Sequence, residues 1–226
     1  MVRGLFVTGT GTGVGKTVVC AALIHRYRRS APLRYWKPIQ TGIEHDDDTR
    51  EVSELAECRQ TEVFARGIRL PRPLSPHLAA RLNGTTISLD DVVREIESEP
   101  THYRWIVEGA GGVLVPLNDT HMMCDLMVRL NLPIVVAARS GLGTINHTLL
   151  TIDALLRRRL RVAGVVMVGD PHGDDCAAIE RHGGVEVIGE MPRFPELTPT
   201  AVAAWATGHL DQRGGLLEFL YDEQPR

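Results

Sequence analysis

The sequence predicts an α/β fold in which a mostly parallel sheet is flanked by helices on both faces. Short apolar runs alternate with segments whose apolar residues recur at helical spacing, as in strand–helix–strand units. Several of these runs are almost wholly apolar, which is typical of strands covered on both faces. Polar, glycine-rich motifs directly follow three of the runs. In a parallel sheet this is the edge where ligands bind.

The expected elements alternate along most of the chain. Strands are expected at Leu5–Thr8, Arg34–Lys37, Trp105–Glu108, Pro133–Ala138, Val162–Val168 and Val185–Ile188. Helices are expected at Lys16–Arg29, Thr49–Cys58, Leu89–Ser98, His121–Leu130, Ile145–Leu160 and Asp174–His182. Ser88 and Thr144 are placed to cap two of them. The proline-rich segment 69–77 interrupts the alternation and is too short to link two domains.

Composition narrows the class of protein. The 226 residues are 43% hydrophobic, enough for one large core or at most two small ones. The net charge of −3 is mixed along the chain, so we expect no nucleic-acid partner. The four cysteines lie far apart and are expected as reduced thiols. The sequence shows neither a leader nor an apolar run of membrane length, so we expect a soluble, cytoplasmic protein with no membrane partner.

The segment "LFVTGTGTGVGKTVV", residues 5–19, predicts a phosphate-binding loop. Its glycines do not fit the pattern G-x-x-x-x-G-K-[ST], because Thr10 stands where the first glycine belongs and Gly9 comes one residue early. The order strand, glycine-rich loop and helix nevertheless points amide donors at an anion. Lys16 can reach the β- and γ-phosphates, and the hydroxyl of Thr17 can bind Mg²⁺. A mere tight turn does not explain this Lys-Thr pair.

Two further motifs follow the second expected strand. In "YWKPIQTG", Lys37 ends the strand, where it is either an ordinary solvated terminus or a cation for an anionic group. In "HDDDT", Asp46, Asp47 and Asp48 precede a helix. They fit an N-cap with favourable dipole placement, or an oxygen ligand for Mg²⁺.

The later motifs lie after the third and fourth strands. Glu108 ends the apolar run "WIVE" and precedes "GAGG"; an acid in such a strand is costly without a partner, and it suits a metal or water ligand. The segment "SGLGTINHT" opens a helix with free amides, a second anion site suited to a carboxylate. His147 taken alone is more often an ordinary helix histidine.

Taken together, these motifs closely resemble dethiobiotin synthetase. The matching stretches are "GTGTGVGKT", "KPIQTG", "SPH", "VEGAGG" and "LGTINHT", and they run to about Val168. The resemblance implies one domain over residues 1–226 with a P-loop NTPase-like fold, acting as a homodimer. It also accounts for the extra residue between Gly9 and Gly15, which this family's loop contains.

The resemblance implies an ATP-dependent cyclo-ligase of biotin biosynthesis. One amine of 7,8-diaminononanoate takes up CO₂ as a carbamate, ATP phosphorylates the carbamate, and the second amine closes the ureido ring. The products are dethiobiotin, ADP and phosphate. Mg²⁺ is the implied cofactor, and ATP is the co-substrate.

The resemblance also implies roles for individual residues. Lys37, Lys16 and Thr12 are the implied catalytic residues, and Thr17, Asp48 and Glu108 the implied Mg²⁺ ligands. The implied nucleotide contacts are Gly11, Thr12, Gly13, Val14, Gly15, Lys16, Thr17, Val168, Gly169, Met191 and Pro192. The implied substrate contacts are Thr12, Lys37, Thr41, Pro76, His77, Gly109, Ala110, Gly111, Gly112, Leu142, Gly143, Asn146 and His147. The residues alone predict a loop for "SPH", Ser75 to His77.

Two positions depart from the family pattern. Gly13 stands where an acid is common, and Val168-Gly169 stand where an adenine-reading asparagine is expected. We therefore expect CTP or GTP to be accepted better than by a typical member.

The alternatives are a P-loop switch ATPase of the partitioning type and a cobyrinate-synthase-like ligase. The loop of the first, K-G-G-x-G-K-[ST], needs a lysine at Gly11, and the second needs an additional glutaminase domain.

Overall fold

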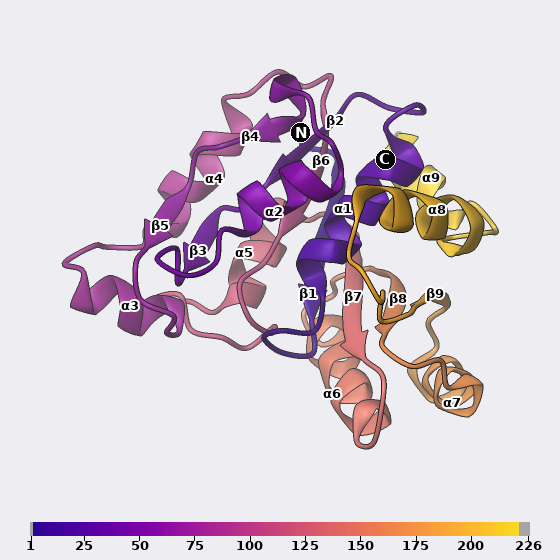
Figure 1. The fold of residues 1–226 in the computed structure, drawn as a ribbon. Helices are drawn as coiled ribbons and strands as arrows, with labels where there is room; N and C mark the ends of the chain where they lie inside the picture. Colours follow the sequence, from indigo (N-terminus) through magenta and orange to yellow (C-terminus); the bar gives the residue numbers. More distant parts are fainter. Residues whose placement is uncertain (1, 222–226) are drawn as a thin grey trace.

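The computed structural model describes residues 2–221. Within that range seven strands form one sheet in the order β4-β2-β6-β1-β7-β8-β9, and β3 pairs with β5 in a small second sheet (Figure 1). The strand pairs of both sheets are parallel, so the predicted sheet is confirmed. The strands are β1 (Gly4–Gly9), β2 (Leu33–Trp36), β3 (Ile39–Thr41), β4 (Val63–Phe64), β5 (Ile68–Leu70), β6 (Arg104–Glu108), β7 (Ile134–Arg139), β8 (Val162–Val168) and β9 (Val187–Met191).

Helices cover both faces of the large sheet, each over its own hydrophobic core. Along β1 the side chains alternate, so Leu5 and Val7 enter one core while Phe6 enters the other. The first core is completed by α1 (Lys16–Tyr27), α2 (Asp48–Leu55), α8 (Pro199–His209) and α9 (Gly215–Tyr221). The second is completed by α3 (Pro76–Leu82), α4 (Leu89–Glu97), α5 (Met123–Leu130), α6 (Thr144–Leu156) and α7 (Gly173–Gly183).

Because the strands are parallel, the predicted motifs meet at one edge of the sheet. The strand β6 lies between β2 and β1, and Glu108 pairs in register with Val7 of β1. On the other side Trp36 pairs with Val107, which brings the next residue, Lys37, beside Glu108. The phosphate loop leaves β1 at the same edge. Sheet register therefore assembles a loop, a lysine and an acid that are distant in sequence.

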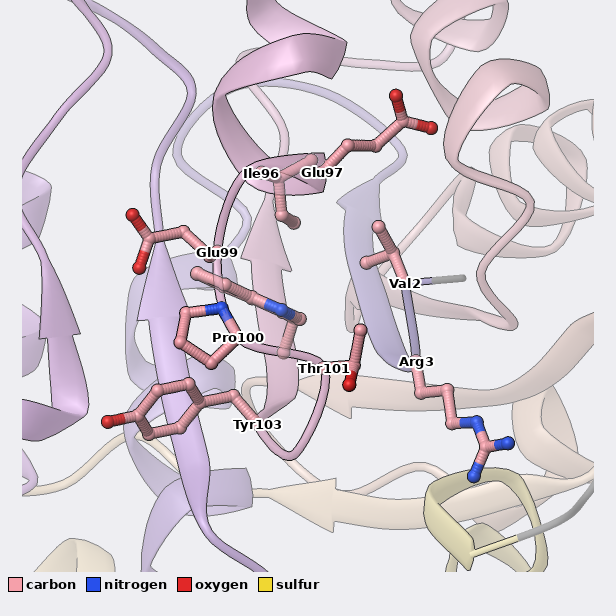
Figure 2. A pocket seen from close by; sticks show the side chains of 9 residues that line it. Val2, Arg3, Ile96, Glu97, Glu99, Pro100, Thr101 and Tyr103 are labelled. Carbon is pink, nitrogen blue, oxygen red and sulfur yellow. The ribbon is translucent and has the colours of Figure 1, made fainter.

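The opposite edge of the sheet has a smaller hollow of about 150 Å³ (Figure 2). It lies among the start of β1, the end of α4 and the start of β6. Its lining residues are Val2, Arg3, Ile96, Glu97, Glu99, Pro100, Thr101, Tyr103 and Trp105. None of these is a predicted site residue.

Several local predictions need correction. Ser88 caps α4 as predicted, through a bond from the Asp91 amide. Thr144 does not cap α6, because Gly143 holds the cap position with a φ of 91° and Thr144 is the first helical residue. The segment at Ser75 to His77 is not a loop, since Pro76 begins α3. A proline there loses nothing, because the first amides of a helix have no partner within it.

Apart from α3, the strands and helices absent from the prediction are either very short or late in the chain. β3, β4 and β5 span two or three residues, too few to show a period. The helices α8 and α9 follow β9, and both pack on the face that carries α1.

Asp211 anchors this C-terminal segment. Its carboxylate accepts hydrogen bonds from the amides of Gly215 (2.9 Å) and Leu216 (2.8 Å), and from the hydroxyl of Tyr27 at the end of α1. The end of α1 away from the phosphate loop is thus linked through Asp211 to the start of α9.

Between residues 2 and 221, no helix is long and apolar enough to cross a membrane. The four cysteines are free, as predicted.

Candidate active site

The phosphate loop connects β1 to α1 through two residues in the left-handed region. Gly13 has a φ of 68° and Gly15 a φ of 92°, so glycine avoids the strain of a side chain at both positions. At Gly15 a β-carbon would also meet Val168 at 2.9 Å. The ammonium of Lys16 folds back over the loop and donates to the carbonyl of Gly11 at 2.9 Å. The loop therefore has the backbone shape and the cation that a phosphate requires.

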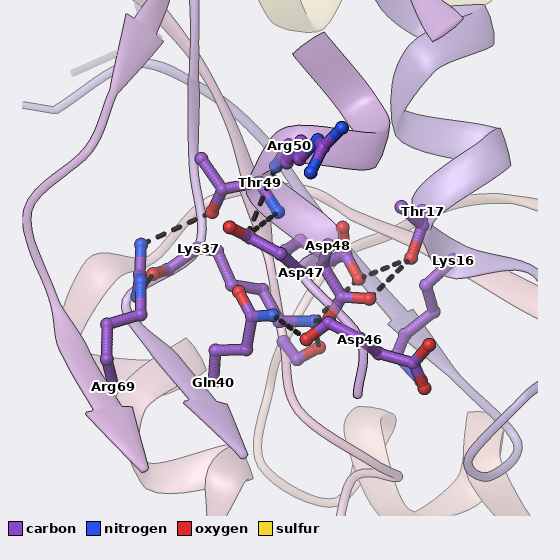
Figure 3. A network of polar contacts seen from close by, with 12 residues as sticks. Lys16, Thr17, Lys37, Gln40, Asp46, Asp47, Asp48, Thr49, Arg50 and Arg69 are labelled. Atoms are coloured by element: carbon purple, nitrogen blue, oxygen red, sulfur yellow. Dashed lines mark hydrogen bonds and ion pairs between the residues drawn. The ribbon is translucent and has the colours of Figure 1, made fainter. Parts of the chain in front are cut away.

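Next to the loop, Lys37 joins two acids at the edge of the sheet (Figure 3). Its Nζ atom lies 2.6 Å from Oδ2 of Asp48 and 2.6 Å from Oε1 of Glu108. It also donates to the carbonyl of Gly109 at 3.2 Å. The hydroxyl of Tyr35 donates to the second oxygen of Glu108 at 2.8 Å. Glu108 is fully buried, and these partners meet the requirement predicted for an acid in that strand.

Burial and neighbouring charge shift the pKa values of this cluster in opposite directions. Burial alone lowers the pKa of Lys37, but Glu108 and Asp48 outweigh it, so the pKa lies above its ordinary value. Burial alone raises the pKa of Asp48, but Lys37 and Thr17 outweigh it, so that pKa is lowered. Lys16 is different, because burial and then repulsion by Lys37 lower its pKa to about 8. Lys37 is thus held as a cation by its acids, whereas Lys16 has no such pair.

The hydroxyl of Thr17 stands between the same two acids. Its Oγ1 atom lies 3.2 Å from Oδ1 of Asp48 and 3.2 Å from Oε1 of Glu108. One hydroxyl hydrogen cannot serve two carboxylates, so these oxygens form a donor set suited to a hard divalent cation. Among residues 2–221 there is no group of three or more His, Cys, Asp or Glu side chains that could hold a metal ion.

The three aspartates before α2 have different surroundings. Asp47 is the N-cap, and its carboxylate accepts from the amides of Thr49 and Arg50 at 3.1 Å each. Asp48, the first helical residue, carries the contacts to Thr17 and Lys37. Asp46 lines the adjoining cavity. The capping interpretation of "HDDDT" therefore fits Asp47, and the ligand interpretation fits the next residue, Asp48.

A cavity of about 730 Å³ opens at this edge of the sheet, within the usual range for ligand sites. Many of the predicted site residues line it: Thr12, Gly13, Gly15, Lys16, Thr17, Lys37, Thr41, Asp48, Pro76, Glu108, Ala110 and Gly111. The predicted loop, cation and acid positions therefore share one cavity.

Other predicted residues lie outside that lining. Val168 packs on Gly15, and the amide of Gly169 donates to the carbonyl of Met191 at 2.8 Å, so three of the expected base contacts sit together beside the loop. Leu142, Gly143, Asn146 and His147 lie at the start of α6, with Leu142 fully exposed. The remaining positions outside the lining are Gly11, Val14, His77, Gly109, Gly112 and Pro192.

The sequence motifs did not predict three polar residues that support the site. Tyr35 lies two residues before Lys37 on the same strand face, and strand alternation could have identified it. The side-chain amide of Gln40 donates to the carbonyl of Asp46 at 2.9 Å, and the guanidinium of Arg69 donates to the carbonyl of Lys37 at 2.8 Å. These two contacts depend on the β3–β5 sheet, which has no local sequence signal.

Lys16 and Lys37 are also the only lysines in the sequence. The rest of its 25 lysine and arginine residues are arginines. Both lysines are buried, with exposed fractions of 6% and 3%.

Comparison with known proteins agrees with this geometry. A family model described as an AAA domain matches residues 3–201. A protein of Paramagnetospirillum magneticum named ATP-dependent dethiobiotin synthetase is 47% identical over 89% of this chain and 93% of its own. A protein of Agrobacterium fabrum with the same name is 41% identical over 87% of this chain and 89% of its own.

Solved structures show a broader likeness of fold. The MinC:MinD cell division protein complex of Aquifex aeolicus contains a chain that matches with a TM-score of 0.59 at 13% identity, covering all of this chain and 98% of the other. At that identity the match shows a shared fold alone, so it does not favour the switch-ATPase alternative.

The unequal surroundings of the two lysines predict unequal effects on stability. Lys37→Met leaves Glu108 buried without its cation and should lower the free energy of unfolding by about 3–5 kcal/mol. Lys16→Met removes a buried cation that lacks an acid partner and should change it by less than about 1 kcal/mol. Urea unfolding at neutral pH with EDTA measures both.

A second replacement serves as the control. When Glu108→Gln is added to Lys37→Met, part of the lost free energy of unfolding should be recovered, because the unpaired carboxylate charge is removed as well. Equal losses for the two single lysine variants would contradict the assigned pairing.

Proposed function

Because the chain belongs to the ATP-dependent dethiobiotin synthetase family, we propose that it converts 7,8-diaminononanoate, CO₂ and ATP into dethiobiotin, ADP and phosphate. The observation that carries the proposal is the cavity in which the phosphate loop faces Lys37, Asp48 and Glu108. A phosphoryl group bound by the loop would meet a cation there, beside a space large enough for a second substrate.

The reaction needs three bond-forming steps. One amine of the diamine adds to CO₂, loses a proton and becomes a carbamate. A carbamate oxygen then attacks the γ-phosphorus, the bond to ADP breaks, and a carbamoyl phosphate forms. The second amine attacks the carbonyl carbon, the bond to phosphate breaks, and loss of a proton completes the ureido ring.

Charge is the main difficulty, since a carbamate anion must approach a polyanion. Lys16, curled over the loop, and Lys37, at its side, offset this charge by position rather than by proton transfer. Their burial strengthens the effect, because both act away from bulk water. The protein's contribution is therefore orientation and electrostatics.

Thr17, Asp48 and Glu108 would hold Mg²⁺. When bound, the ion would neutralise phosphate charge. The donor set supports this assignment, since it combines one hydroxyl with two carboxylates around one point. The cation Lys37 contacts both acids and so holds them in place.

The diamine would lie along the rest of the cavity. Thr12 and Thr41 line it together with the two lysines, while Pro76, Ala110 and Gly111 line the part formed by α3 and the loop after β6. His77, Gly109 and Gly112 adjoin that wall. These positions would orient the two amines toward the phosphate.

Product formation tests the proposed function. The protein with 7,8-diaminononanoate, bicarbonate, Mg²⁺ and ATP should release phosphate in step with dethiobiotin. Lys16→Met and Lys37→Met should each lower turnover by at least about 100-fold, as expected for loss of a charge-stabilising group. Arg157→Met, which alters an exposed ion pair, should have no effect. The absence of diamine-dependent phosphate release would refute the assignment.

A broader choice of nucleotide base follows from Val168 and Gly169. Neither side chain offers an amide to read adenine, and Val168 instead packs on Gly15. We expect kcat/KM with CTP or GTP within about tenfold of the value with ATP, since lost hydrogen-bond readout removes most discrimination. Turnover compared across four nucleoside triphosphates measures this. A strong preference for ATP alone would contradict it, and Val168→Asn should increase the ATP preference.

The start of α6 would serve the substrate carboxylate at a homodimer interface. Leu142 is fully exposed there, and Gly143, Asn146 and His147 lie outside the cavity of their own chain. Leu142→Asp should therefore shift a dimer toward monomer and raise the KM for the diamine. Light scattering after gel filtration measures the first effect. Leu156→Asp, at the other end of α6, is the matched control; a wild-type monomer would exclude the dimer.

A further inference from the structure

Arg69, on the short strand β5, lies behind the active-site cluster. Its Nη1 atom donates to the carbonyl of Lys37 at 2.8 Å, and its Nη2 atom donates to the hydroxyl of Thr49 at 3.2 Å. Figure 3 shows the guanidinium reaching Thr49 from the far side of the cluster. Arg69 is not part of the cavity lining, so it does not meet bound molecules directly.

The two segments that Arg69 joins also meet each other on the cavity side. Lys37 carries the ammonium that lies 2.6 Å from Asp48, and Asp48 is bonded to Thr49 in the chain. The contacts therefore form a closed ring through Arg69, Lys37, Asp48 and Thr49. Because β2 and α2 are otherwise separate elements, the ring fixes the position of the lysine relative to the acid.

The local backbone is shaped for this contact. Gly67 has a φ of 130°, and a β-carbon there would lie 2.7 Å from the carbonyl of Pro38 and 3.0 Å from Nη1 of Arg69. The chain before β5 thus passes close enough to leave no room for a side chain. A planar fork with donors at fixed angles suits two acceptors in two segments, which a lysine ammonium cannot reproduce.

We propose that Arg69 is a positioning residue, which holds the lysine-bearing end of β2 and the acid-bearing start of α2 at their working separation. The proposal rests on the function given above. It differs from simple support of the β3–β5 sheet, because its effect should appear in turnover and in the response to Mg²⁺, rather than in stability alone.

The test is a kinetic comparison at saturating diamine, bicarbonate and ATP. Arg69→Met should lower kcat by about 10- to 100-fold, with each substrate KM within about threefold, as for residues that orient a catalytic group. It should also raise the Mg²⁺ concentration needed for half-maximal rate. Arg69→Lys should not restore kcat. The matched control is Arg66→Met. Arg66 is a neighbouring exposed arginine, whose guanidinium carbon lies 5.8 Å from the ring centroid of Phe64.

A second pair of variants keeps the proposal testable if Arg69→Met does not fold. Thr49→Val removes the hydroxyl at similar volume and should lower kcat, whereas Thr49→Ser keeps the hydroxyl and should lose less. An unchanged kcat in a folded Arg69→Met, or equal kcat values in the two Thr49 variants, would overturn the proposal. A wild-type protein without dethiobiotin formation would instead refute the proposed function.

Discussion

The burial of the Glu108 carboxylate is the constraint on which the rest of the site depends. A carboxylate with no exposed surface at the end of a central strand is stable only when it is paired. Lys37 supplies the charge, and Tyr35 and Thr17 supply hydrogen bonds, so β2, β6 and α1 must converge there. The same pairing places an acid and a lysine side by side next to the phosphate loop. A requirement of folding and a requirement of the proposed chemistry thus fall on one residue.

Much of this arrangement could be predicted because strand ends in a parallel sheet share an edge. The loop, Lys37, Asp48 and Glu108 were each predicted from a motif after or near a strand, and one cavity contains them. The remainder depends on contacts distant in sequence. Arg69 and Gln40 act through strands of three residues, which have no readable period. Thr144 looked like a helix cap, but Gly143 reaches the left-handed conformation more easily and took that position.

The fold and the site carry different information about the protein. The sheet and its helices are shared with a chain of a cell division protein complex at 13% identity. Relatives above 40% identity instead carry the name of a ligase. The phosphate loop also differs from the loop pattern of a switch ATPase, because Gly11 and Thr12 stand where that pattern has a lysine and a glycine. The second lysine of the cavity is Lys37, which follows β2, two strands away from β1 in the sheet.

The scarcity of lysine gives the chain an unusual chemical selectivity. With lysine confined to positions 16 and 37, both almost fully buried, the exposed surface relies on arginine for permanent positive side-chain charge. Reagents that acylate primary amines would find their side-chain targets inside the cavity beside the phosphate loop rather than on the exterior. Lysine labelling would therefore report whether this cavity is occupied, because a molecule bound in it would cover both ammonium groups.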